Sequence, residues 1–123
     1  MNIVIWIIQT VLALMFLAAG VMKMSQPKEK LASTMAWVND FSPATVKLIG
    51  GLELLAGLGL ILPQLTGILP WLTPLAALGL VLTMLGAAVT HARRKEGQLI
   101  GVNIVLLALA AFVAIGRFWL VPV

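Results

Sequence analysis

Four polar residues lie within or at the edges of long apolar runs, in positions where a side chain could bind a ligand or exchange a proton: Lys23, Glu53, His91 and Asn103. Polar side chains at membrane depth are costly and are therefore candidates for function. Glu53 is the strongest, since about ten helical residues, a rise of roughly 15 Å, precede it in its run. It has two interpretations: a structural partner of Lys23 or Asn103, or a carboxylate that binds a polar ligand group or a proton.

The other three residues also have a structural interpretation beside the functional one. A lysine at the end of a span usually extends its ammonium group to the interface. His91 precedes Arg93 and Arg94, at a membrane edge where a histidine needs no ligand. Asn103 could donate a hydrogen bond between helices, worth about 1 kcal/mol. The sequence leaves both interpretations open for each.

The residue counts exclude several kinds of site. There is no cysteine, which rules out thiolate metal ligands and thiol–disulfide exchange. His91 is the single histidine and cannot by itself build a zinc site, so no metal site is predicted. The net charge of +4 comes with no basic run longer than residues 93–95. We interpret it as a sign of membrane topology and predict no nucleic-acid partner.

The elements that must position these residues are membrane-spanning helices. Of 123 residues, 62% are hydrophobic and 10% charged, whereas soluble domains average about 45–50% apolar and about 25% charged. A span takes about 20 apolar residues, so the chain has room for four spans and no second domain. We predict a single all-α integral membrane four-helix bundle over residues 1–123, with spans at about 3–22, 43–62, 74–91 and 99–120.

Turn-forming residues suggest the span boundaries. Ser42 and Pro43 fit an N-cap followed by proline at the first helical position. Pro63 is expected to end the second span, and Pro70 and Pro74 to open the third. Between the first two spans, residues 25–40 form what we call the interfacial segment. Its apolar residues recur at helical spacing and predict one short amphipathic helix in the membrane interface: Leu31, Met35 and Val38, beside Trp37.

Charge distribution predicts the orientation. Of the eight Lys and Arg residues, only Arg117 falls on the side of the termini. The positive-inside rule then places the charged loops in the cytoplasm and both termini outside, in a cell membrane of the bacterial inner-membrane type. Tryptophans at the two interfaces would form aromatic belts, with Trp37 inside and three residues outside: Trp6, Trp71 and Trp119.

Each span carries small and polar residues at helical spacing, which would allow close packing around a common interior. The four stripes are Gln9, Ala13, Phe16, Gly20 and Lys23; Gly50, Glu53 and Gly57; Gly79, Thr83, Ala87 and His91; and Asn103, Ala110, Ala114 and Arg117. By depth, the four candidate ligand-binding residues should converge in the cytoplasmic half. Gln9 and Arg117 should meet as a polar pair near the outer surface, unless Arg117 pairs with lipid phosphate.

The sequence resembles the DoxX-like family of small four-span membrane proteins. The similar stretches cover nearly the whole chain in order: residues 9–23 (QTVLALMFLAAGVMK), 50–60 (GGLELLAGLGL), 86–96 (GAAVTHARRKE) and 103–118 (NIVLLALAAFVAIGRF). The resemblance implies one of three roles: in quinone-coupled oxidation of sulfur compounds, in resistance to quinone-like or oxidative stress, or in assembly with other membrane proteins. Five residues match the family's polar positions: Glu53, Lys23, His91, Asn103 and Arg117.

Three functional hypotheses follow. The first is a bundle that binds an apolar molecule with a polar head, such as a quinone or a membrane lipid. The second is a non-catalytic assembly factor or subunit that docks a membrane-protein partner, with the interfacial segment as a docking surface. The third is a small proton-coupled exporter, which would have to form a homo-oligomer. The sequence contains no nucleotide, flavin or metal motif, so redox chemistry would need a bound quinone or a partner subunit.

Overall fold

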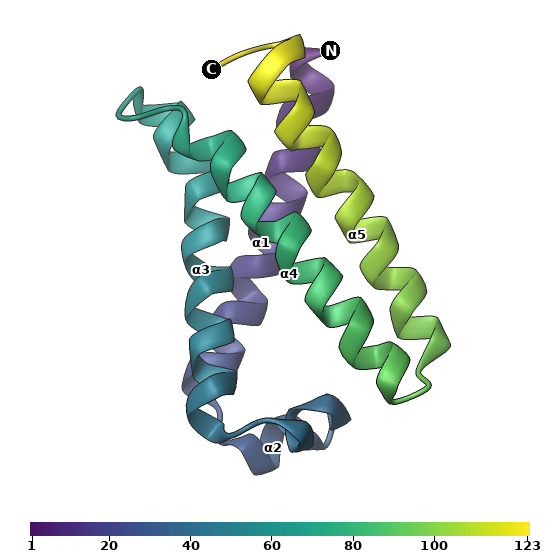
Figure 1. The fold of residues 1–123 in the computed structure, drawn as a ribbon. Helices are drawn as coiled ribbons and strands as arrows, with labels where there is room; N and C mark the ends of the chain where they lie inside the picture. The colour runs from purple at the N-terminus through teal and green to yellow at the C-terminus, as the bar shows by residue number, and fades with distance from the viewer.

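The computed structural model describes residues 1–123 as helices without strands (Figure 1). The four long helices are α1 (Asn2–Ser25), α3 (Pro43–Thr66), α4 (Leu72–Arg93) and α5 (Gly97–Ile115), which continues into a π-helical turn, η2 (Gly116–Leu120). All four are long and apolar enough to cross a membrane. The predicted all-α four-span bundle is confirmed. Both termini lie at one end, the terminal end, and the α4–α5 loop lies at the other, the loop end (Figure 1).

The predicted boundary at Pro63 was wrong. Pro63 does not end the second span, because α3 continues to Thr66 and stops at Gly67, whose φ is 73°. A proline near the end of a helix removes only one backbone N–H, and glycine adopts the left-handed conformation that then closes the helix. At the third span, α4 begins at Leu72, between the two prolines that were predicted to open it. Pro74 fits its first turn, where N–H groups have no partner within the helix.

The interfacial segment forms two short helices, α2 (Lys28–Ala32) and the 3₁₀ helix η1 (Ala36–Asp40), where the sequence predicted one. Hydroxyl groups end the first of them: Ser33 donates to the carbonyl of Lys30 at 2.7 Å. Such local bonds compete with continued helix. Leu31 and Val38 still face inward, where they pack with Val46 at the start of α3.

The start of α3 agrees with the prediction. Ser42 is the N-cap, and its hydroxyl oxygen accepts a hydrogen bond from the backbone N–H of Thr45 at 3.2 Å. Pro43 occupies the first helical position, where its fixed φ suits the helix. The cap determines the residue at which α3 begins after the interfacial segment. It therefore also determines how far along the span Glu53 lies.

The four helices form two antiparallel pairs, α1 with α3 and α4 with α5. The pairs approach each other toward the terminal end and diverge toward the loop end (Figure 1). The main apolar core lies mostly between the middle of the bundle and the terminal end; it includes Ile5, Leu12, Leu60, Leu80 and Val113. Only 26 of 123 residues are buried, as expected where most apolar side chains face lipid.

The predicted stripes of α1, α3 and α5 are buried, whereas the stripe of α4 is buried only in part: His91 is buried, and Thr83 and Ala87 are half-buried. Gly79 is exposed and has open space beside it. Each step of four residues along a helix turns about 40° further than one full circle. Over the three steps from Gly79 to His91, the side chains therefore shift by about a third of a circle around the helix. The packed face of α4 runs through Thr73, Ala77, Leu80, Met84 and His91, and it includes only the last residue of the predicted stripe.

Candidate ligand-binding pocket

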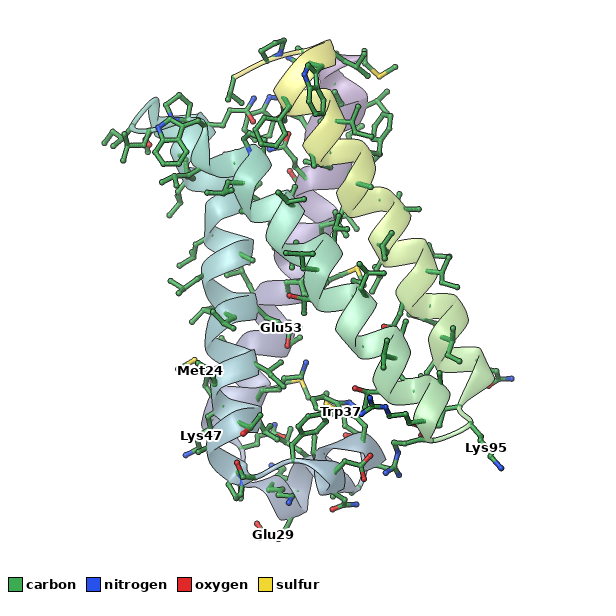
Figure 2. The ribbon with its side chains drawn as sticks, viewed as in Figure 1. Met24, Glu29, Trp37, Lys47, Glu53 and Lys95 are labelled. Atoms are coloured by element: carbon green, nitrogen blue, oxygen red, sulfur yellow. The ribbon has the colours of Figure 1, made fainter.

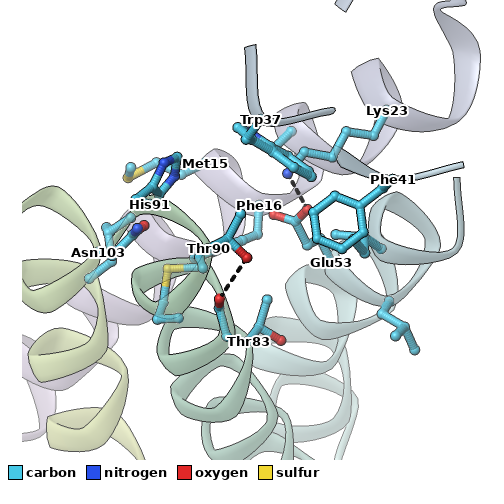
Figure 3. A pocket seen from close by; sticks show the side chains of 17 residues that line it. Met15, Phe16, Lys23, Trp37, Phe41, Glu53, Thr83, Thr90, His91 and Asn103 are labelled. Carbon is cyan, nitrogen blue, oxygen red and sulfur yellow. Dashed lines mark hydrogen bonds and ion pairs between the residues drawn. The ribbon is translucent and has the colours of Figure 1, made fainter. Parts of the chain in front are cut away.

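A cavity of about 490 Å³ lies between the two helix pairs toward the loop end (Figure 3). Residues of α1, α3, η1, α4 and α5 line it. The structure brings together all four residues that the sequence indicated for ligand binding: Lys23, Glu53, His91 and Asn103. The cavity exists because the divergence of the helix pairs leaves space that the apolar core does not fill. Whether these residues bind a ligand stays a prediction.

Lys23 and Glu53 form a buried ion pair on the wall made by α1 and α3. The Lys23 Nζ donates a hydrogen bond to Oε1 of Glu53, and the two side chains are 10% and 3% exposed. The ammonium group also lies 5.2 Å from the ring centroid of Trp37, within the range of a cation–π contact. The ion pair between Glu53 and Lys23 that the sequence suggested is present, and no hydrogen bond joins Glu53 to Asn103.

His91 is held from outside the pocket by a chain of charged groups. Its Nδ1 lies 2.9 Å from Oε1 of Glu96, and the same oxygen accepts from Nε of Arg94 at 3.2 Å. Arg94 also donates through Nη1 to Asp40 of η1 at 2.9 Å. This last hydrogen bond raises the pKa of the Arg94 guanidinium. The chain thus ties the interfacial segment to the α4–α5 loop and to the imidazole at the pocket wall.

Asn103 presents an unpaired amide. Its side chain is buried, and Nδ2 has no hydrogen-bond partner. The neighbouring hydroxyl groups on α4 donate to backbone carbonyls, Thr83 to that of Gly79 and Thr90 to that of Gly86, and neither accepts a hydrogen bond from Asn103. Buried polar groups without partners are rare in native structures, and each needs an explanation. Here, the amide lines a cavity in which a ligand could accept its hydrogen bond.

Three residues in or beside the pocket were not identified as site residues from the sequence: Trp37, Phe41 and Glu96. Trp37, predicted at the membrane interface, turns into the cavity and meets Phe41 edge to face at 5.7 Å (Figure 3). Glu96 does not line the cavity but orients His91. No sequence signal places these side chains, because each depends on how the interfacial segment and the α4–α5 loop fold back. No cluster of three or more metal-ligating side chains is present.

The cavity also reaches the outer surface of the helices. Met15 of α1 and Leu52 of α3 both line it, yet their exposed fractions are 45% and 55%. Outward-facing apolar side chains of a span contact lipid acyl chains. An apolar tail bound in the cavity could therefore remain in contact with the bilayer, while the polar groups lie in the half of the bundle toward the loop end, where Figure 2 shows Glu53 and Trp37.

At the terminal end, Gln9 and Arg117 lie together as the sequence suggested. Arg117 donates through Nε to Gln9 Oε1, and Gln9 in turn donates to the carbonyl of Leu60 at 2.7 Å. Arg117 is only 1% exposed and also donates to Asn2 at 2.7 Å. The Trp6 ring lies 5.4 Å from its guanidinium carbon. This cluster joins α1, α3 and η2 and is remote from the pocket.

Comparison with known proteins places the chain in a family without giving it a reaction. The DoxX-like family matches residues 7–113, which contain the four long helices nearly complete and all the pocket residues described above. No curated protein and no solved structure matches the chain. Because the match covers most of the sequence and the fold has four long apolar helices, this four-span membrane protein belongs to the DoxX-like family.

Proposed function

We propose that this DoxX-like protein binds an apolar molecule with a polar head, quinone-like or lipid-like, in the cavity at the loop end. The observation that carries the proposal is the buried, unpaired Nδ2 of Asn103 beside a cavity of about 490 Å³. Ligand pockets are typically about 300–1,000 Å³, mostly apolar, with a few polar groups that fix the ligand's orientation. An amide N–H group without a hydrogen-bond partner, on a residue that lines such a cavity, fits this description.

The charges of the pocket favour a head without net charge. Glu53 is offset by Lys23, so a charged head would meet no uncompensated partner on that wall. Phe16, Trp37 and Phe41 supply flat apolar surface around the head position. The tail would extend past Met15 or Leu52 toward lipid. With a quinone as ligand, redox chemistry would belong to that molecule, and these side chains would bind and orient it.

The proposed orientation follows from the Lys and Arg residues, which lie almost entirely at the loop end. The positive-inside rule would place the pocket in the cytoplasmic half of a bacterial inner membrane and both termini outside.

Mass spectrometry and visible absorption of what co-purifies with the protein in mild detergent would test the proposal. The variants to compare with the wild type are Glu53→Gln and Asn103→Leu, with Gln98→Leu as a matched control. Gln98 is an exposed amide on the same helix as Asn103. We expect a stoichiometric amphiphile in the wild type and the control, and reduced amounts in both pocket variants.

An empty cavity in all four proteins would contradict the proposal and favour the assembly-factor alternative, which crosslinking to partners in native membranes would then examine. Drug flux driven by a pH gradient in proteoliposomes would instead favour the exporter. Equal ligand content in the wild type and both pocket variants would place the binding site elsewhere in the bundle.

A further inference from the structure

Two polar groups on the wall formed by α4 and α5 lack a partner within the protein. One is Nδ2 of Asn103, which is buried without a hydrogen bond. The other is Nε2 of His91: the ring hydrogen bond of this residue runs from Nδ1 to Glu96, and none is made by Nε2. Both side chains line the cavity (Figure 3), whereas Glu96 lies outside it. Of the two ring nitrogens of His91, Nε2 is therefore the one that is free to bind a ligand.

Glu96 determines which ring nitrogen of His91 carries hydrogen. The carboxylate also accepts from Arg94, and an ionised carboxylate can only accept. Nδ1 of His91 must then be the donor. In a neutral imidazole the second nitrogen is an acceptor, and the hydrogen bond made by one ring nitrogen sets the state of the other. As a neutral imidazole, His91 therefore offers a lone pair at Nε2, while Asn103 offers N–H groups.

We infer that the polar head of the ligand carries a hydroxyl group, which donates to Nε2 of His91 and accepts from Nδ2 of Asn103. The inference deepens the proposed function and rests on it. A hydroxyl is the simplest neutral group with one donor and two acceptor lone pairs on a single atom. A carbonyl or an ether oxygen would satisfy Asn103 but leave Nε2 of His91 unpaired. Glu96 is the positioning residue, since it acts on the ligand only through the imidazole.

The single histidine of the chain makes this inference directly measurable. Protein labelled with ¹⁵N-histidine and placed in nanodiscs would give imidazole signals from His91 alone. Two probes differ only in the O–H group: 4-nonylphenol and its methyl ether, 4-nonylanisole. We expect the free protein to show hydrogen on Nδ1 and a lone pair on Nε2. The phenol should shift the Nε2 signal and bind at least about tenfold more tightly than the ether, as loss of a buried hydrogen bond implies.

Three variants separate positioning from packing. Glu96→Gln can donate to Nδ1 instead of accepting, so we expect hydrogen to move to Nε2 and the preference for the phenol to fall. Asn103→Leu should weaken phenol binding while leaving the His91 tautomer as in the wild type. Gln98→Leu, the exposed amide on α5, should behave as the wild type in both measurements.

The outcomes distinguish this inference from the proposed function. Equal binding of both probes, or hydrogen on Nε2 in the wild type, would overturn the hydroxyl assignment while the amphiphile pocket stands. Failure of both probes to bind or to perturb the imidazole signals would overturn the assignment and count against the pocket itself.

Discussion

A Cβ atom added at Gly20 would lie 2.6 Å from the carbonyl oxygen of Gly50, so α1 and α3 touch backbone to backbone at this point. The contact is one turn from the Lys23–Glu53 pair on both helices. Gly50 has a second role, because a Cβ there would meet Cβ of Lys23 at 2.6 Å. The missing side chain leaves the path along which Lys23 reaches Glu53. Close packing in the bundle and the ion pair of the pocket therefore depend on the same two glycines.

Replacing Gly20 with alanine should destabilise the bundle. The added methyl group would meet backbone atoms of Gly50 and Leu54, which cannot move aside as a side chain can, and overpacking of this kind costs about 1–3 kcal/mol. Unfolding in mixed detergent and SDS micelles, followed by circular dichroism, would measure the loss. Gly101→Ala is the control: Gly101 is also helical but has nothing within 4 Å, so we expect no loss there. Equal stability of both variants would contradict the close approach.

Removing the ammonium group of Lys23 should cost more than removing the whole ion pair. Lys23→Met leaves Glu53, which is 3% exposed, without a partner, and breaking a buried pair this way costs about 3–5 kcal/mol. The double variant Lys23→Met with Glu53→Leu removes both charges and should recover most of that stability. The same SDS titration completes the double-mutant cycle. Additive losses in the two single variants would show that the pair is not coupled.

At the terminal end, Gln9→Leu should destabilise the packing of α1 against α3 and η2, which the amide of Gln9 joins. The variant loses the hydrogen bond to the Leu60 carbonyl and leaves Nε of Arg117 without its acceptor. An unsatisfied buried polar group costs about 1–3 kcal/mol, and more for a charged one. Gln98→Leu, an exposed amide, should change stability by no more than about 0.5 kcal/mol. Thermal unfolding of both variants in one detergent would compare them, and equal midpoints would contradict a structural role for Gln9.

Asp40→Asn should loosen the interfacial segment without unfolding the bundle. Arg94 reaches η1 only through its hydrogen bond to Asp40, and the segment packs on α3 through the separate cluster of Leu31, Val38 and Val46. We expect faster amide hydrogen exchange over residues 28–40 and unchanged exchange in the middle of the spans. Slow exchange of the segment in this variant would show that its apolar cluster and the contact of Trp37 with Lys23 hold it in place without the Arg94–Asp40 hydrogen bond.

Much of the architecture follows from the sequence because its causes are local or depend on the membrane. Four apolar runs must form helices, since lipid offers no partner for backbone N–H and C=O groups. The N-cap at Ser42 is also local, as the hydroxyl and the N–H that it accepts from are three residues apart. The sequence could also predict that four polar residues are buried in the half of the bundle toward the loop end: Lys23, Glu53, His91 and Asn103. Each is one of the few polar residues in an apolar run, and the known rise of a helix gives its height along the span.

Only the tertiary structure decided what those residues contact. The open space around them exists because α1–α3 and α4–α5 diverge, and crossing angles depend on how side chains of different helices interlock. Trp37 enters the pocket because the interfacial segment folds back through two short helices, and Glu96 meets His91 because the α4–α5 loop turns within five residues. Gly79 shows the limit of the helical pattern, which gives the spacing of residues on one helix but not the side that faces its neighbours. The amino-acid sequence thus determined which polar groups are buried, and the packing determined which of them remain free for a ligand.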